Sequence, residues 1–180
     1  MAAQNNLSLR NLKIAHWNAD GIKNQITEVK QFLVHYKIDI LLISETNLST
    51  GNTIQIPGYN LFTKKRGPNA KGGGVLIAAK NNINCSQVNL DTKSIEAIGI
   101  KLNQDLTIIA GYLRPQNKLD TKELDSIFNC SSSVILMGDL NCKHRTWNCY
   151  RANQNGTTLY KYLQNTPYTL LAPDGFTHYP

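Results

Sequence analysis

Five polar side chains stand where predicted apolar strands end, and their chemistry suits phosphodiester hydrolysis. They are Asn18, Glu45, Tyr112, Asp139 and Asn141. A carboxylate such as Glu45 holds Mg²⁺, which prefers oxygen ligands and retains several waters. A buried aspartate such as Asp139 orients or deprotonates an attacking water, and amide and phenol groups donate hydrogen bonds to phosphate oxygens. Since ligand sites gather outside strand ends, the set predicts metal-assisted hydrolysis of a phosphodiester.

Each of these residues also has a purely structural interpretation. The DLN segment at 139–141 is typical of an Asx turn that ends a strand, and Asn18 precedes a predicted turn. Glu45 is equally compatible with a helix cap or an ion pair, and Tyr112 with an ordinary strand aromatic. The functional interpretation therefore depends on the joint pattern of four strand ends.

The elements that must position these residues follow from hydrophobic periodicity. Apolar or alternating runs predict strands over residues 12–17, 38–44, 59–65, 75–79, 85–90, 94–102, 106–113 and 134–141. Helical spacing and capping residues predict helices over 24–36, 120–129 and 157–164, with a loop at 151–156. The opening strand–helix–strand unit predicts two parallel neighbours, whereas the middle of the chain, with a turn at 103–104, predicts antiparallel pairing. Two sets of strands flanked by helices favour a two-sheet α/β sandwich.

The charge balance favours a polyanionic partner. Nineteen Lys and Arg residues oppose twelve Asp and Glu residues, which gives a formal net charge of +7. Nucleic acid is the commonest partner of such a chain, and a solvated basic surface is the alternative. The basic, Gly-rich segment around 66–74 is predicted either to grip the DNA backbone or to form a solvated hairpin. Its candidate contacts are Lys64, Lys65, Arg66 and Lys71.

The cysteines and the hydropathy of the chain indicate an intracellular protein without a membrane segment. Cys85, Cys130, Cys142 and Cys149 form no CxxC pair, so they are interpreted as reduced thiols of an intracellular protein rather than zinc ligands. Residues 1–11 are polar and are predicted to be disordered or loosely attached. Neither a signal peptide nor a membrane segment is expected.

Four short motifs at these strand ends resemble a known superfamily. The segments WNADGI (17–22), LLISET (41–46), GYLRP (111–115) and GDLN (138–141) occur in the order seen in the endonuclease/exonuclease/phosphatase superfamily. The later segments NCKHRTWN, NQNGTTLYKYL and FTHYP resemble the endonuclease domain of non-LTR retrotransposons of the jockey and chicken-repeat kind. The likeness runs from about residue 12 to the last residue.

The resemblance implies a fold and a role for each strand-end residue. The fold is a four-layered α/β sandwich of two mixed sheets flanked by helices, spanning residues 12–180. Asn18 and Glu45 would hold Mg²⁺, with Mn²⁺ as a substitute. Tyr112 would contact the scissile phosphate, Asn141 would bind it, and Asp139 would align water or assist the leaving group.

The resemblance also implies a partner. DNA is the expected substrate, and a reverse transcriptase is expected in the parent element. Arg114 and Asn155 are further candidate DNA contacts. For Asn155, as for His144 and Trp147 in the same segment, an architectural role is favoured over DNA contact.

One departure from the family pattern concerns the end of the domain. Related domains carry an Asp and then a Ser-Asp-His after the Thr-and-Pro segment, and this chain has no counterpart of either. The expectation is an incomplete domain that lacks the last strands of the fold, with low solubility and impaired hydrolysis. None of His16, His35, His144 and His178 is expected to replace the histidine. His16 in particular is expected to point away from Asn18 or to pack.

Three functions remain open on the sequence. The leading one is a metal-dependent DNA endonuclease that nicks target DNA in the nucleus and leaves a 3′-hydroxyl for target-primed reverse transcription. The second is a catalytically inactive remnant that still binds DNA through its basic surface. The third is a phosphatase of the same superfamily that acts on lipid or inositol phosphates.

Overall fold

The computed structural model describes residues 12–49, 51–65, 72–102, 105–173 and 175. Several sequence predictions concern positions outside these ranges. They are the loose segment 1–11, the DNA contacts Arg66 and Lys71, the turn at 103–104, and His178 in the FTHYP segment.

The first half of the chain forms a mixed four-stranded sheet, here called sheet A, with the order β1-β2-β4-β3. Its strands are β1 (Ile14–Asn18), β2 (Ile40–Ser44), β3 (Tyr59–Lys64) and β4 (Val75–Lys80). The helix α1 (Ile22–Tyr36) connects β1 to β2, which are parallel, while β4 runs antiparallel to both of its neighbours. The predicted parallel strand–helix–strand unit is therefore confirmed.

The second half forms sheet B, which is also mixed and has the order β5-β6-β7-β8. Its strands are β5 (Cys85–Asn89), β6 (Ile95–Leu102), β7 (Leu106–Leu113) and β8 (Ser133–Asp139). The helix α2 (Thr121–Phe128) leads into β8, which pairs parallel with β7. A short 3-10 helix (Arg145–Trp147) and α3 (Gln154–Gln164) follow β8.

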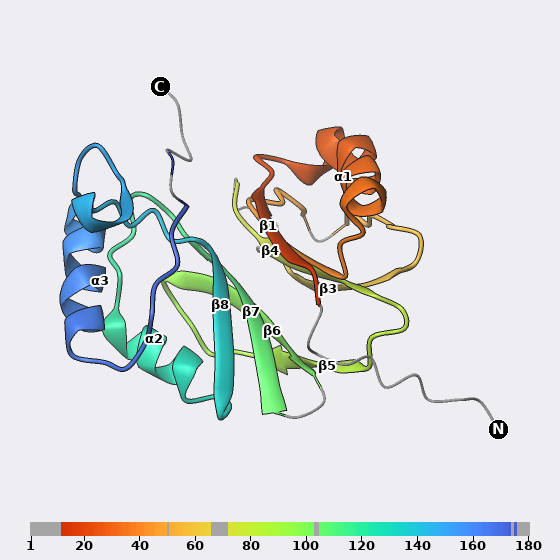
Figure 1. Cartoon of the computed structure of the whole chain (residues 1–180). Helices are drawn as coiled ribbons and strands as arrows, with labels where there is room; N and C mark the ends of the chain where they lie inside the picture. Colours follow the sequence, from red (N-terminus) through yellow and green to blue (C-terminus); the bar gives the residue numbers. More distant parts are fainter. Residues whose placement is uncertain (1–11, 50, 66–71, 103–104, 174, 176–180) are drawn as a thin grey trace.

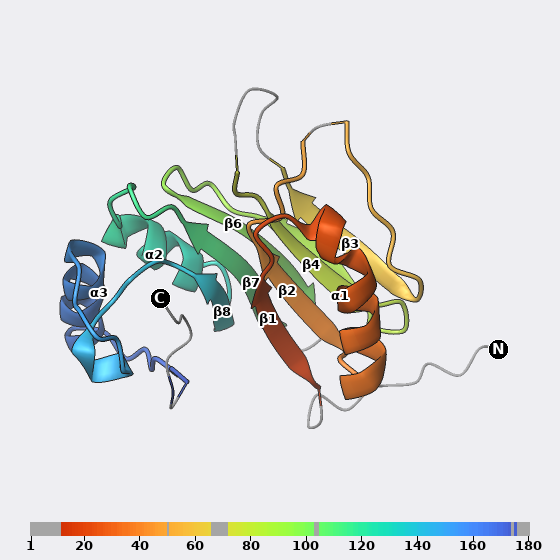
Figure 2. The same ribbon diagram turned by 90° about the horizontal axis from the view of Figure 1, so that it is seen from above.

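The two sheets face each other and carry their helices on the outside. Figures 1 and 2 show α1 on the outer side of sheet A and the pair α2 and α3 beyond sheet B. Two mixed sheets flanked by helices match the predicted α/β sandwich, and the helices supply its outer two layers. Within the described residues, no helix is long and apolar enough to cross a membrane.

The strand β2 shows how one apolar run serves both layers. Because side chains alternate along a strand, Ile40 and Leu42 enter the core between the sheets, whereas Leu41 and Ile43 pack beneath α1. All five of its residues are buried, as expected for a strand covered on both faces. By the same alternation, the side chain of Ser44, the last residue of β2, faces sheet B. Glu45 follows directly after the end of the strand.

One predicted helix boundary is wrong. The helix α3 begins at Gln154, within the predicted loop 151–156, rather than after Gly156. Asn153 is the N-cap, and its side-chain oxygen accepts a hydrogen bond from the Gly156 N–H. Gly156 lies in the first turn of α3, where a Cβ atom would overlap the Lys143 carbonyl oxygen.

Two paired glycines bring β7 and β8 together directly below the strand ends. Gly111 of β7 is the register partner of Gly138 of β8. A Cβ atom at Gly138 would overlap the Gly111 carbonyl oxygen, so only glycine fits there. This pair fixes the position of Tyr112, which follows Gly111, relative to Asp139, which follows Gly138.

We expect Gly138→Ala to destabilise the fold by about 3 kcal/mol, because the new methyl group forces β7 and β8 apart. Gly51→Ala is the matched control, since a Cβ atom at Gly51 meets nothing within 4 Å. Chemical denaturation of both variants measures the difference. Equal free energies of unfolding for the two variants would contradict the close approach of the strands.

Candidate active site

The Asn18 amide joins three strand ends. Its Nδ2 atom donates to Glu45 Oε1 at 2.8 Å and to Asp139 Oδ2 at 2.9 Å. Asn18 ends β1, Glu45 follows β2 in sheet A, and Asp139 ends β8 in sheet B. One side chain therefore uses both of its N–H hydrogens to hold together two carboxylates that come from different sheets.

Tyr112 lies in the same cluster. Its side chain is only 4% exposed, and its hydroxyl group is hydrogen-bonded to Glu45. Burial raises the pKa of Tyr112 well above its usual range, and the Glu45, Asp139 and Asp20 carboxylates raise it further. The phenol thus stays protonated and can donate a hydrogen bond to an anion.

Asp20 is the site residue that the sequence analysis missed. It contributes to the negative potential at Tyr112, and its N–H donates to Asn18 Oδ1 at 3.3 Å. The signal was present in the motif WNADGI, where Asp20 follows Asn18 by two residues, but Asp20-Gly21 was interpreted only as a turn. The exposed Asp20 carboxylate thus adds to the negative charge that acts on the Tyr112 phenol.

The backbone around the site adopts sparsely populated conformations. Four non-glycine residues in these loops have positive φ angles: Asp20 (40°), Glu45 (53°), Asn47 (52°) and Asn141 (49°). Non-glycine residues rarely adopt positive φ angles. Those that do cluster at functional sites, where surrounding contacts hold the backbone in place. Glu45 is held by the Gly21 N–H, which donates to its carbonyl oxygen at 2.8 Å.

The donor set fits a hard divalent cation. Glu45 and Asp139 present carboxylate oxygens within hydrogen-bond distance of one amide nitrogen. In the part of the chain that the structure describes, no group of three or more His, Cys, Asp or Glu side chains is placed to hold a metal ion. A cation bound here would therefore keep several waters, which is the habit of Mg²⁺.

The orientation of the Asn18 amide adds a positioning role to its predicted metal-binding role. A metal ligand must offer oxygen, but Asn18 turns its Nδ2 atom toward both carboxylates. An oxygen in that position would be repelled by two anions, so the orientation of the amide is physically determined. Asn18 therefore positions the two carboxylates, and metal ligation by Asn18 and by Glu45 stays a prediction.

Asp139 and Asn141 form the predicted Asx turn and belong to the site as well. Asp139 Oδ1 accepts a hydrogen bond from the Asn141 N–H at 2.9 Å, while Oδ2 faces Asn18. The Asn141 amide donates to the Leu113 carbonyl at 2.9 Å, which ties the end of β8 to the end of β7. The structural and functional interpretations of this segment are compatible, because the turn is what aims the Asp139 carboxylate.

A buried hydrogen-bond chain lies one layer below the carboxylates. Ser44 Oγ donates to the Gly111 carbonyl at 3.1 Å and lies 2.9 Å from His16 Nε2. Because the Ser44 hydrogen is used, His16 Nε2 must carry the donated proton. The chain links β1, β2 and β7 beneath the site.

The expectation that His16 points away from Asn18 is wrong. The two residues are two positions apart, so they share the face of β1 that looks toward sheet B. Burial lowers the pKa of His16, and the Asp139 carboxylate raises it in part. The expectation that His16 packs in the interior agrees with its contact to Ser44.

Four predicted DNA contacts fall within the described residues, and all four have hydrogen-bond partners within the chain. Lys64 Nζ donates to the Leu90 carbonyl and to Thr92 Oγ1, both at 3.3 Å. Lys65 Nζ donates to the Asn52 carbonyl at 2.6 Å. Both ammonium groups tie loops of the chain together, and their contact with DNA stays a prediction.

Asn155 is also architectural. It is 7% exposed, its Oδ1 accepts from the Leu119 N–H at 3.0 Å, and its Nδ2 donates to the Asn117 carbonyl at 2.7 Å. Its assignment as a DNA contact is therefore corrected in favour of the architectural alternative. Arg114 follows β7 at the site edge and donates to the Gly72 carbonyl at 3.3 Å, so it remains a candidate.

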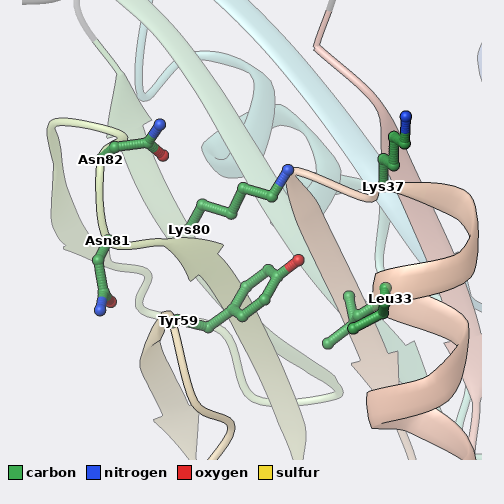
Figure 3. Close-up of a pocket in the computed structure, with 8 residues that line it drawn as sticks. Leu33, Lys37, Tyr59, Lys80, Asn81 and Asn82 are labelled. Carbon is green, nitrogen blue, oxygen red and sulfur yellow. The ribbon is translucent and has the colours of Figure 1, made fainter.

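A shallow pocket lies at the opposite end of sheet A and is separate from this site. Figure 3 shows the Tyr59 ring and Leu33 beside the Lys80 side chain, with Asn81 and Asn82 at its rim. Lys80 ends β4, which runs antiparallel to β2, so the pocket lies beside the start of β2. Among the described residues, no acidic residue lines it, so it lacks the carboxylates found at the strand ends.

A family model described as the endonuclease/exonuclease/phosphatase family matches residues 15–179. The chain belongs to this family, as its fold and its cluster of strand-end carboxylates indicate. Among solved structures, the endonuclease domain of TRAS1, a telomere-specific non-LTR retrotransposon, has a TM-score of 0.67 at 18% identity. An AP endonuclease from Archaeoglobus fulgidus has a TM-score of 0.63 at 19% identity. Each alignment covers 86% of this chain, with 71% of the TRAS1 chain and 70% of the AP endonuclease chain, and they bear out the predicted fold.

Curated relatives place the chain among retrotransposon proteins. It is 30% identical over 175 residues to the probable RNA-directed DNA polymerase from transposon X-element of Drosophila melanogaster. It is 28% identical over 173 residues to the RNA-directed DNA polymerase from mobile element jockey of the same organism. These matches cover 94% and 93% of this chain but 19% of each relative, so the chain spans about a fifth of their length. The predicted resemblance to jockey-type elements is confirmed.

We expect His16 to make stability depend on pH. Its pKa in the folded state is lowered, so the unfolded chain binds a proton more readily once the pH falls below about 6.5. The contribution of His16 is therefore retained above that value and lost below it. Measured between pH 7.5 and 5.5, the free energy of unfolding should fall more in the wild type than in His16→Gln. The control is His35→Gln, which replaces an exposed histidine on α1 and should leave the wild-type pH dependence unchanged.

Proposed function

We propose that this chain is the metal-dependent DNA endonuclease domain of a non-LTR retrotransposon, and that it nicks target DNA by hydrolysing one phosphodiester. The observation that carries the proposal is the Asn18 amide, which holds the Glu45 and Asp139 carboxylates together beside the buried Tyr112 hydroxyl. The family and the retrotransposon relatives support it.

Each residue has a distinct part in the proposed reaction. Glu45 holds Mg²⁺, or Mn²⁺ in its place, which when bound neutralises charge that develops on the phosphate. Asp139, oriented by Asn18 and by the Asn141 N–H, accepts a proton from the attacking water. Tyr112 donates a hydrogen bond to a phosphate oxygen. Asn141 uses its remaining amide hydrogen to bind the phosphate, since the other donates to the Leu113 carbonyl.

The proposed biological role follows from the relatives. Their names identify RNA-directed DNA polymerases of mobile elements, and we propose that the parent protein of this chain also carries a reverse transcriptase. The nick would leave a 3′-hydroxyl, whose oxygen takes its proton from water as the phosphodiester bond breaks. The reverse transcriptase would prime DNA synthesis from this hydroxyl. The reaction would take place in the nucleus, where the target DNA lies.

A second candidate function is DNA binding without hydrolysis. Its supporting observation is that, among the histidines in the described ranges, the one at the strand ends is His16, which is bonded to Ser44 beneath the carboxylates. A buried histidine of lowered pKa is a poor proton donor to a leaving group. Hydrolysis and binding must therefore be measured separately.

We expect Glu45→Gln to slow Mg²⁺-dependent nicking of supercoiled plasmid at least about a hundred-fold, because the charge that holds the cation is lost while the side-chain volume is kept. Glu28→Gln is the matched control, since Glu28 is exposed on α1. Chelation of the metal should stop the wild type and the control alike. The endonuclease proposal fails if Glu45→Gln nicks at the wild-type rate. It also fails, in favour of the second candidate, if the wild type binds DNA but never nicks it.

A further inference from the structure

The loop between β8 and α3, residues 142–153, is closed at its base by Asn153. The Asn153 N–H donates to the Lys143 carbonyl at 2.9 Å, and its Oδ1 accepts from the Lys143 N–H at 3.0 Å. Its Nδ2 donates to the Asn141 carbonyl at 2.7 Å. The two ends of the loop are thus fixed to each other and to the turn that holds Asp139.

Packing inside the loop fixes its shape. Trp147 Nε1 donates to the Cys142 carbonyl at 2.9 Å. The His144 ring stacks on Tyr160 of α3, with ring centroids 4.5 Å apart and planes 11° from parallel. It also contacts Trp147 at a centroid distance of 4.9 Å. The loop therefore has its own small core and presents its tip on a rigid support.

The tip of this supported loop is exposed and aromatic. The Tyr150 side chain is 78% exposed, and the Arg151 guanidinium lies 5.6 Å from the centroid of its ring. Lys143 and Arg145 are exposed on the same loop, and residues 142–153 contain no acidic residue. Neither Tyr150 nor Arg151 takes part in the network that closes the loop.

The loop lies at the edge of the molecule that carries the active site. It starts three residues after Asp139, and Figure 1 shows it rising at the same edge as the ends of β1, β7 and β8. DNA with its scissile phosphate at Asp139 would pass next to a surface that is basic and bears one projecting ring. The loop fits a nucleic acid by charge, and the ring offers a stacking face.

We propose that Tyr150 and Arg151 form a DNA contact that flanks the cleavage site. Arg151, with Lys143 and Arg145, pairs with backbone phosphates, and the Tyr150 ring packs against a base or sugar beside the nicked position. This inference rests on the proposed function, because it takes DNA as the substrate. It adds a substrate-binding surface outside the strand-end cluster.

The contributions of Tyr150 and Arg151 to DNA binding should differ in their dependence on salt concentration. Arg151→Ala removes one phosphate contact, so the slope of log affinity against log salt concentration should fall by about one unit. Tyr150→Ala removes stacking, so DNA affinity should fall about ten-fold with the slope unchanged. Tyr150→Phe keeps the ring and should bind as the wild type does.

Fluorescence anisotropy with a labelled DNA duplex, in the presence of a chelator, measures these effects without any reaction. Tyr36→Ala is the matched control, because Tyr36 is 54% exposed at the C-terminal end of α1, away from the strand ends. Thermal melting of each variant verifies the fold. The inference is overturned if Tyr150→Ala and Arg151→Ala bind DNA as tightly as Tyr36→Ala, with the same salt slope.

The same experiment separates this inference from the proposed function. If the wild type does not nick DNA, yet Tyr150→Ala still binds about ten-fold more weakly, the contact surface stands and the endonuclease proposal falls. If nicking depends on Glu45 but DNA binding is indifferent to Tyr150 and Arg151, the endonuclease proposal stands and this surface is rejected.

Discussion

The two hydrogen bonds donated by the Asn18 amide are the constraint on which the rest of the structure depends. They require that carboxylates from two different sheets lie within 3 Å of one nitrogen atom. Hydrogen bonds weaken steeply beyond that range, so the sheets must keep their separation closely at this edge. The cluster also concentrates negative charge on a basic chain, which suits a site that holds a cation while the surrounding surface attracts a polyanion.

The layer beneath the carboxylates supplies this precision. Ser44, Gly111 and Gly138 each stand one residue before a member of the site, namely Glu45, Tyr112 and Asp139. Ser44 donates a hydrogen bond to the Gly111 carbonyl, and Gly111 pairs closely with Gly138. These contacts fix where β2, β7 and β8 end relative to one another. Because a one-residue slip in a strand turns every side chain to the other face, this layer fixes register as well as distance.

The sequence predicted the strands and strand-end residues well, because buried strands are apolar runs and the polar residues that follow them stand out. Prediction from the sequence was less successful where the role of a residue depends on contacts with residues far away in the chain. Lys64 and Lys65 were predicted as DNA contacts, and their carbonyl partners at residues 90 and 52 were not foreseen. Asp20 looked like a turn residue because its proximity to Tyr112 arises only when the sheets face each other.

The central claim is that Glu45 binds the catalytic cation, with Asn18 as the group that positions its carboxylate. The most direct measurement is an anomalous difference map from crystals soaked in Mn²⁺. The account predicts one strong peak about 2 Å from a Glu45 carboxylate oxygen, with water completing the coordination. A peak bound elsewhere on the chain, or none near Glu45 at a Mn²⁺ concentration that supports nicking, would contradict it.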